Sequence, residues 1–171
     1  MTCRTKISSS QSSTSSDRAS PNSVHLKFFD GFSKFDYDDT ETVISEFHRL
    51  GRSRGWKKGS KTWRRNWKLC MSEMYDSVIG DHINDLETWR QLCRKLDIQG
   101  ELNSITKCKK ALAKVYVNIV DLLECWATDM PPKLFKSSSA LANYTKEASM
   151  FFARDLAKQD KLLRVLLRHL L

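Results

Sequence analysis

Basic and aromatic side chains alternate over one short stretch of this chain, where together they could hold a polyanion such as a nucleic-acid strand. Between Glu46 and Glu73 there is no acidic residue, whereas nine arginines and lysines fall in that interval. Cationic side chains bind phosphates, and aromatic rings can stack on unpaired bases. The formal net charge of the whole chain is also +9, so its basicity is local. The candidate polyanion-binding residues are Arg52, Arg54, Trp56, Lys57, Lys58, Lys61, Arg64, Arg65 and Lys68.

Three tryptophans lie in the same stretch, and their spacing assigns them different roles. Trp63 and Trp67 are four residues apart and align with Met71 and Met74, which is the spacing of one buried helix face. We therefore expect these two rings in the core and consider only Trp56, in the loop before the helix, for base stacking. The alternative is an ordinary helix with a solvated basic face, partly neutralised by the acidic residues between positions 36 and 46.

The sequence contains no pattern typical of a calcium-binding loop or of a catalytic site. The acidic run that begins at Asp36 would place Glu41 and Phe47 at the sixth and twelfth positions of a calcium loop, which need Gly and a bidentate Glu. Acidic residues before a helix are explained by the helix dipole. The chain has no nucleophile elbow, phosphate loop or paired Glu/His metal motif. We predict no catalytic residue, no metal and no cofactor, although a Cys–His pair assembled in space stays open.

The cysteines argue for a reducing compartment. There are five, an odd number, and they are widely spaced, which does not fit a disulfide framework. Cys93, Cys108 and Cys125 are 15 and 17 residues apart, without a C-x-x-C pair or a histidine at zinc-finger spacing, so we interpret them as buried structural cysteines. We expect an intracellular protein, either cytoplasmic or nuclear.

Composition predicts an all-α fold. The 171 residues are 40% apolar, enough for one compact core, and contain only six glycines and three prolines, too few for a sandwich or barrel. No apolar run approaches the ~20 residues that span a bilayer, so we expect no transmembrane segment. We predict a disordered serine-rich tail over residues 1–23 and a single multi-helix domain of about five to seven helices over residues 24–171.

Apolar residues recur at helical spacing along most of this domain. An aromatic cluster between residues 26 and 37 is expected to pack on the helices. Gly51 is predicted to stop the first helix, Asn84 or Asp85 to cap the third, and Ser104 to cap the fourth, which should break near Val117. The predicted helices cover residues 43–50, 60–79, 83–96, 105–123, a short segment from 138, and 150–171. Leucines in the last helix should close the core, with a partner helix, a membrane surface or a dimer as alternatives.

Several short motifs give the chain a family resemblance. They are Phe28-Phe29, Phe35-x-Tyr37, Glu46-Phe47-x-Arg49-Leu50, Gly55-Trp56, Leu86-x-x-Trp89-x-x-Leu92-Cys93, Cys108-Lys109, Asn118-Ile119-Val120-Asp121-Leu122, Tyr144-Thr145 and the leucine-rich end. With these motifs the chain resembles a group of small helical proteins from filamentous fungi that have no assigned activity. The resemblance covers roughly residues 26–171. It implies a helical domain and no particular activity.

The sequence thus predicts a non-catalytic intracellular helical domain that acts by protein interaction or regulation, with an unidentified protein partner. The alternative is nucleic-acid binding through the basic, tryptophan-containing segment 49–68. A toxin-like or selfish-element factor of fungi is a remote third interpretation. The oligomeric state stays open.

Overall fold

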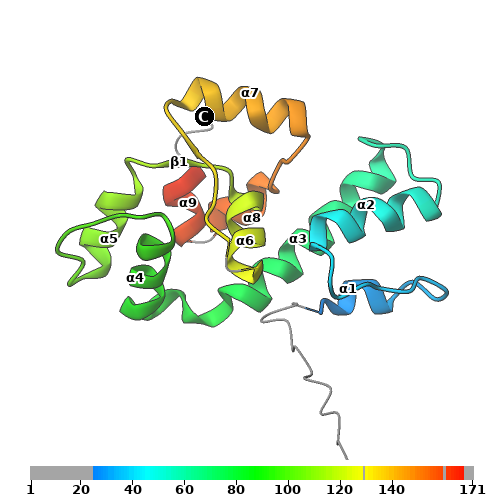
Figure 1. Cartoon of the computed structure of the whole chain (residues 1–171), viewed down its shortest axis with the longest axis horizontal. Coiled ribbons are helices and arrows are strands. Elements are labelled where there is room, and N and C mark those ends of the chain that lie inside the picture. Colours follow the sequence, from blue (N-terminus) through cyan, green and yellow to red (C-terminus); the bar gives the residue numbers. More distant parts are fainter. Residues whose placement is uncertain (1–24, 129, 160, 168–171) are drawn as a thin grey trace, which may run out of the picture.

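The computed structural model describes residues 25–128, 130–159 and 161–167, so the predicted tail lies outside the described residues. Within these ranges the fold is all-α, as predicted, with one short antiparallel ribbon (Figure 1). The elements are α1 (Lys27–Asp30), α2 (Val43–Ser53), α3 (Lys61–Val78), the 3₁₀ helix η1 (Gly80–Asn84), α4 (Leu86–Lys95), α5 (Ile105–Leu112), β1 (Tyr116–Val117), α6 (Ile119–Thr128), β2 (Leu134–Phe135), α7 (Ser138–Ala148), α8 (Arg154–Gln159) and α9 (Lys161–Leu167).

The longer helices begin where the sequence offers a side-chain acceptor. At each of five helix starts an oxygen of the N-cap residue accepts a hydrogen bond from a backbone N–H two or three residues later. The caps are Thr42, Ser60, Asp85, Ser104 and Ser137. Ser104 confirms the predicted cap of α5, and Asp85 is the correct one of the two residues that the sequence offered for α4.

Gly51 does not end a helix, and this prediction was wrong. Helix α2 continues through Gly51 to Ser53, and the glycine is buried. Gly51 lies beside two aromatic rings: a Cβ built there would lie 3.7 Å from Cε3 of Trp56 and 4.0 Å from Cδ1 of Trp63, which are ordinary contact distances. Gly51 therefore marks a close contact between α2, the following loop and α3.

The described residues hold nine α-helices where five to seven were expected, because α1 forms in the aromatic segment and two of the predicted long helices each correspond to a pair of shorter ones. The fourth predicted helix breaks as expected near Val117, but the break is a strand, β1, which pairs with β2. The last predicted helix does not begin at Met150. Residues 150–153 are irregular, and α8 and α9 follow on either side of residue 160, which lies outside the described residues.

Helix α3 is the axis of the core. In Figure 1 it runs along the length of the molecule, with α1 and α2 beside its first half and α4 and α5 at the other end. The aromatic residues expected to pack on the helices do so: Phe29 is buried, and Phe28, Phe32, Phe35 and Tyr37 pack against the core. The segment before α2 thereby covers one end of α3.

A buried asparagine holds the irregular segment in place. Asn118 caps α6 by accepting the N–H groups of Val120 and Asp121 at 2.8 and 3.3 Å. Its Nδ2 donates to Thr145 Oγ1 and to the carbonyl oxygen of Met150, both at 3.0 Å. One side chain thus joins α6, α7 and the turn after α7, which positions residues 150–153 against α3.

Candidate nucleic-acid interface

The basic segment, residues 49–68, forms a corner made of the end of α2, a loop and the start of α3. The loop turns at Gly55 and Gly59, whose φ angles of 66° and 78° are strained for other residues. Helix α3 then begins after its N-cap Ser60, whose hydroxyl oxygen accepts the N–H of Trp63 at 3.2 Å. The end of α2, the loop and the start of α3 lie together at one end of the molecule (Figure 1), and they carry the cations of the segment.

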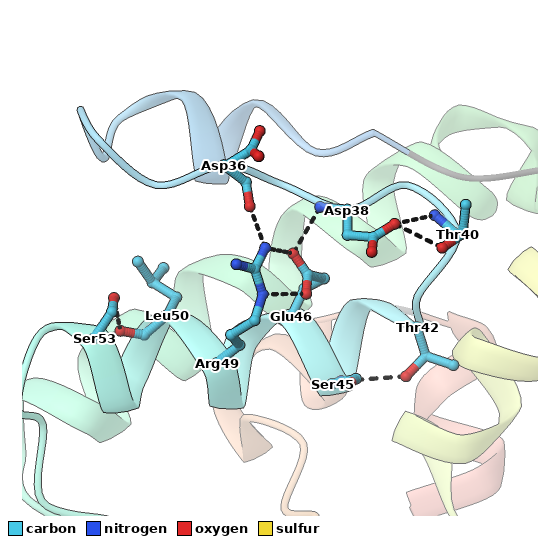
Figure 2. Close-up of polar contacts among 9 residues, drawn as sticks. All are labelled: Asp36, Asp38, Thr40, Thr42, Ser45, Glu46, Arg49, Leu50 and Ser53. Carbon is cyan, nitrogen blue, oxygen red and sulfur yellow. Dashed lines mark hydrogen bonds and ion pairs between the residues drawn. The ribbon is translucent and has the colours of Figure 1, made fainter.

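Arg49 is engaged by an ion pair with a buried carboxylate, that of Glu46. Its Nε donates to Glu46 Oε1 at 2.7 Å and its Nη2 to Oε2 at 2.5 Å, while Nη2 also donates to the carbonyl oxygen of Asp36 (Figure 2). The Glu46 side chain is almost fully buried and also accepts the N–H of Asp38 at 2.9 Å. Burial acts to raise the pKa of Glu46, but the bonds from Arg49 and Asp38 outweigh it and lower that pKa.

Two further cations of the segment are engaged with the protein itself. Arg54 donates from Nη2 to the carbonyl oxygen of Ser33 at 2.7 Å and lies 5.5 Å from the ring centre of Phe32. Lys68 is half-buried and forms an ion pair with Asp155 of α8. The acidic neighbours in sequence therefore neutralise Arg49, whereas the partner of Lys68 comes from the C-terminal part of the chain.

Six cations remain exposed, and we call them the basic corner. None of them has an ion pair with any residue in the described part of the chain. The end of α2, the loop and the start of α3 each contribute cations, and three of the six lie within the first five residues of α3. The members are Arg52, Lys57, Lys58, Lys61, Arg64 and Arg65. The predicted exposed side of α3 is thus confirmed for Lys61, Arg64 and Arg65, but Lys68 is only partly exposed.

The tryptophans take the positions that their spacing predicted, with one difference. Trp63 and Trp67 are buried, with ring centres 5.1 Å apart and planes at 12°. Trp56, the candidate for base stacking, is half-buried, and its ring packs edge-on against Phe32 at 5.5 Å and close to Phe47 at 6.0 Å. The ring of Trp56 therefore contacts the aromatic cluster more than the solvent, which leaves less of it for base stacking.

An open cleft of about 660 Å³ adjoins the basic corner. One wall is α3 with the loop before it, and the other is the irregular segment after α7. Phe151 lies in the second wall and is 54% exposed, an unusual state for a phenylalanine. The lining residues are Lys58, Gly59, Trp63, Arg64, Trp67, Lys68, Ser149, Phe151, Phe152 and Ala153. We call this the aromatic cleft.

Sequence reasoning missed the second wall of this cleft. The indole Nε1 of Trp67 donates to the carbonyl oxygen of Phe151 at 2.7 Å, across 84 residues of sequence. Residues 150–153 were predicted as helix, which would have placed Phe151 on a helical face. The adjacent pair Phe151-Phe152 before a polar stretch was the one available signal, and alone it indicates no partner.

The charges of the basic corner affect the pKa of a neighbouring histidine, His48. The ring of His48 lies 6.2 Å from that of Trp63 and 6.1 Å from that of Trp67, at near-parallel angles of 28° and 30°. Burial, followed by the charges of Lys58 and Arg52, lowers the pKa of His48. Burial and the positive potential of the corner therefore both favour the neutral imidazole.

The cysteines are placed as structural residues. Cys93 and Cys108 are fully buried as expected, but Cys125 is half-exposed. Burial raises the pKa of Cys93 to about 12 and also raises the pKa of Cys70 and Cys125, so these thiols stay protonated and poorly nucleophilic. In residues 25–128, 130–159 and 161–167, no group of three His, Cys, Asp or Glu side chains could hold a metal ion. No helix in these ranges is long and apolar enough to cross a membrane.

Comparisons with protein-family models, with curated proteins and with solved structures found no match. The resemblance to small fungal proteins therefore stays a prediction. What the chain can bind has to be inferred from its surface.

Proposed function

We propose that this protein is a non-catalytic binding module, acting in the cytoplasm or nucleus, whose basic corner holds the phosphate backbone of a nucleic acid. The observation that supports the proposal is the set of six exposed cations without an acidic partner among the described residues. Arg49, Arg54 and Lys68 show that cations of the same segment can be engaged with the protein. The six of the basic corner are left to solvent and to ligands.

The crowding of these charges favours an anionic partner. Like charges repel, and the charges of Lys58 and Arg52 add to burial, the larger cause, in lowering the pKa of His48. A phosphate-lined strand relieves this repulsion and releases its own counterions. If four to six cations contact phosphates, the logarithm of the binding constant should fall against the logarithm of the salt concentration with a slope of roughly −4 to −5.

A salt series tests the proposal. The full chain is titrated against labelled single- and double-stranded DNA and RNA, with a variant in which Lys61, Arg64 and Arg65 are changed to Glu. Lys68 is left intact because it is paired with Asp155. We expect the wild-type chain to bind near physiological salt, and its binding constant to fall steeply at higher salt concentrations. The variant should not bind.

A matched variant controls for net charge. Lys110, Lys114 and Lys136 are exposed and lie outside the basic corner, so changing them to Glu removes the same charge elsewhere. This variant should keep its affinity to within a few-fold, since only the long-range field changes. Equal losses in the two variants, or no binding beyond weak association at low salt, would refute the proposal.

A protein partner is the second candidate, because two large apolar side chains are exposed close together in sequence. Met130 and Leu134, on either side of the Pro131-Pro132 pair, are 61% and 48% exposed. Exposed apolar groups at such positions are typical of protein interfaces. A photo-crosslinking residue at position 134 tests this, with the same residue at the exposed position 139 as its control. A partner that binds here is crosslinked through one defined segment from position 134 and is not crosslinked from position 139. In a separate variant, Leu134→Ser should weaken binding of that partner.

A further inference from the structure

We propose that the aromatic cleft takes one unpaired base of the bound strand, so that the ligand of this protein is single-stranded nucleic acid. This inference rests on the proposed function, because the basic corner supplies the contacts to the backbone. The cleft adds a place for a base next to those contacts.

The cleft and the basic corner share residues. Lys58 and Arg64 belong to the basic corner and also line the cleft, so a phosphate bound between them lies at its rim. Lys68 lines the cleft further along α3. A strand that follows the cations of α3 therefore passes the mouth of the cleft, and the positive rim complements a polyanion rather than an uncharged ligand.

The interior of the cleft suits a flat apolar ring. Four aromatic side chains line it, Phe151 and Phe152 on one wall and Trp63 and Trp67 on the other, and its remaining uncharged lining residues are small. A volume of about 660 Å³ falls in the range of about 300–1,000 Å³ typical of small-ligand sites. Base stacking on an aromatic side chain is worth about 1–3 kcal/mol. Phe151 is the ring most available for it, since more than half of it is exposed.

The wall that carries Phe151 is held at two points. The carbonyl oxygen of Phe151 accepts a hydrogen bond from the indole N–H of Trp67. The carbonyl oxygen of the preceding Met150 accepts one from the side-chain amide of Asn118. The ring of Phe151 is thus presented to solvent by an anchored backbone, and a base meets a surface that is already formed.

The cleft should discriminate little between bases. Ser149 carries the one uncharged hydroxyl or amide among the lining side chains, and the N–H of Trp67 is already used by Phe151. Recognition of a base edge needs several fixed donors and acceptors, whereas stacking accepts any base. A paired base is held inside the duplex, so a duplex would have to be opened before it could use the cleft.

The experiment compares oligonucleotides that differ only in their bases. The full chain is titrated with a single-stranded 12-mer, with an abasic 12-mer of equal phosphate number, and with the duplex of the same sequence. Stacking of one base predicts about 5- to 150-fold tighter binding of the normal strand than of the abasic strand, the fold-change that 1–3 kcal/mol represents. Phe151→Ala should remove most of this ratio.

Leu69→Ala is the control, because Leu69 is exposed to a similar extent, 52%, and lies on α3 outside the cleft lining. It should preserve the ratio. A fluorescent base analogue in the strand should be quenched on binding to the wild-type protein and to Leu69→Ala, and much less with Phe151→Ala.

The outcomes separate the two proposals. Equal binding of normal and abasic strands, with a steep salt slope, would overturn the base site and leave phosphate binding intact. Absence of binding to every oligonucleotide would remove both. A protein dimer that Phe151→Ala dissociates would also overturn the inference, since a second copy of the chain would then occupy the cleft.

Discussion

The carboxylate of Glu124 on α6 accepts a hydrogen bond from the backbone N–H of Val43 at 2.8 Å, although 81 residues separate the two in sequence. A second bond, at 3.2 Å, comes from the N–H of Ile44. These groups are among the N–H donors that the start of α2 leaves without an intrahelical partner. Helix α2 is therefore capped from another helix, which fixes the direction in which it leads to the basic corner.

Glu124 predicts a stability change with pH. Burial and the charge of Asp121 raise the pKa of Glu124 to about 7, against the bonds from Val43 and Ile44. Between pH 4.5 and 7 the folded protein keeps a proton that the unfolded chain releases, so the free energy of unfolding should fall as the pH rises, by up to about 3 kcal/mol. Urea unfolding at several pH values measures this fall. Glu124→Gln should abolish this component, and the same pH profile in both proteins would contradict it.

Glu124→Ala should behave differently from Glu124→Gln. The glutamine keeps an oxygen that can accept the N–H of Val43, whereas alanine leaves the two buried donors without an acceptor. An unsatisfied buried donor costs about 1–3 kcal/mol. We therefore expect Glu124→Ala to lower the free energy of unfolding by at least that much at pH 4.5, and the glutamine variant to lie close to wild type there. Denaturant midpoints at pH 4.5 decide between them.

Gly51→Ala should stabilise the protein. Gly51 is helical, and the added Cβ would meet Trp56 and Trp63 at ordinary contact distances of 3.7 and 4.0 Å. Alanine in a helix interior is favoured over glycine by about 0.5–1 kcal/mol. The paired variant Gly55→Ala should destabilise, because Gly55 has a φ of 66°. Thermal unfolding of both variants tests this, and a lower midpoint for Gly51→Ala would show that the contacts are too tight.

The sequence predicted what depends on local spacing. Helix α3 and the burial of Trp63 and Trp67 follow from one strong helical period, and Ser104 from a local cap. Gly51 was misjudged because a glycine after apolar residues resembles a helix end, whereas here it lies inside α2, beside the rings of Trp56 and Trp63. The engagement of Arg49 and the wall at Phe151 depend on tertiary contacts that have no local signature.

Binding should be coupled to protonation of His48. Bound phosphates would offset the charges of Lys58 and Arg52, which lower the pKa of this imidazole in the free protein, so its pKa should rise in the complex. The complex then takes up a proton more readily, and affinity should increase as the pH falls from 7.5 to 5.5, by at most about tenfold per pH unit. Fluorescence anisotropy at constant salt measures it. In His48→Gln this part of the pH dependence should be absent.

Asp155→Asn should strengthen nucleic-acid binding. It releases Lys68 from its ion pair and leaves one more free cation at the cleft. With a single strand the salt slope should become steeper by about 0.7, with a several-fold gain in affinity. The melting temperature should change little, because exposed ion pairs contribute about 0–1 kcal/mol. Glu101→Gln, which releases Lys107 on α5, is the control and should leave the slope as it is.

The bond between Trp67 and Phe151 also sets an order of events during synthesis. The two residues are 84 positions apart, so at about 5–20 residues per second the second wall of the cleft leaves the ribosome roughly 4–17 seconds after α3. Glu124, which caps α2, also leaves the ribosome before that wall. The growing chain therefore contains every cation of the basic corner, and the cap of α2, before it contains Phe151.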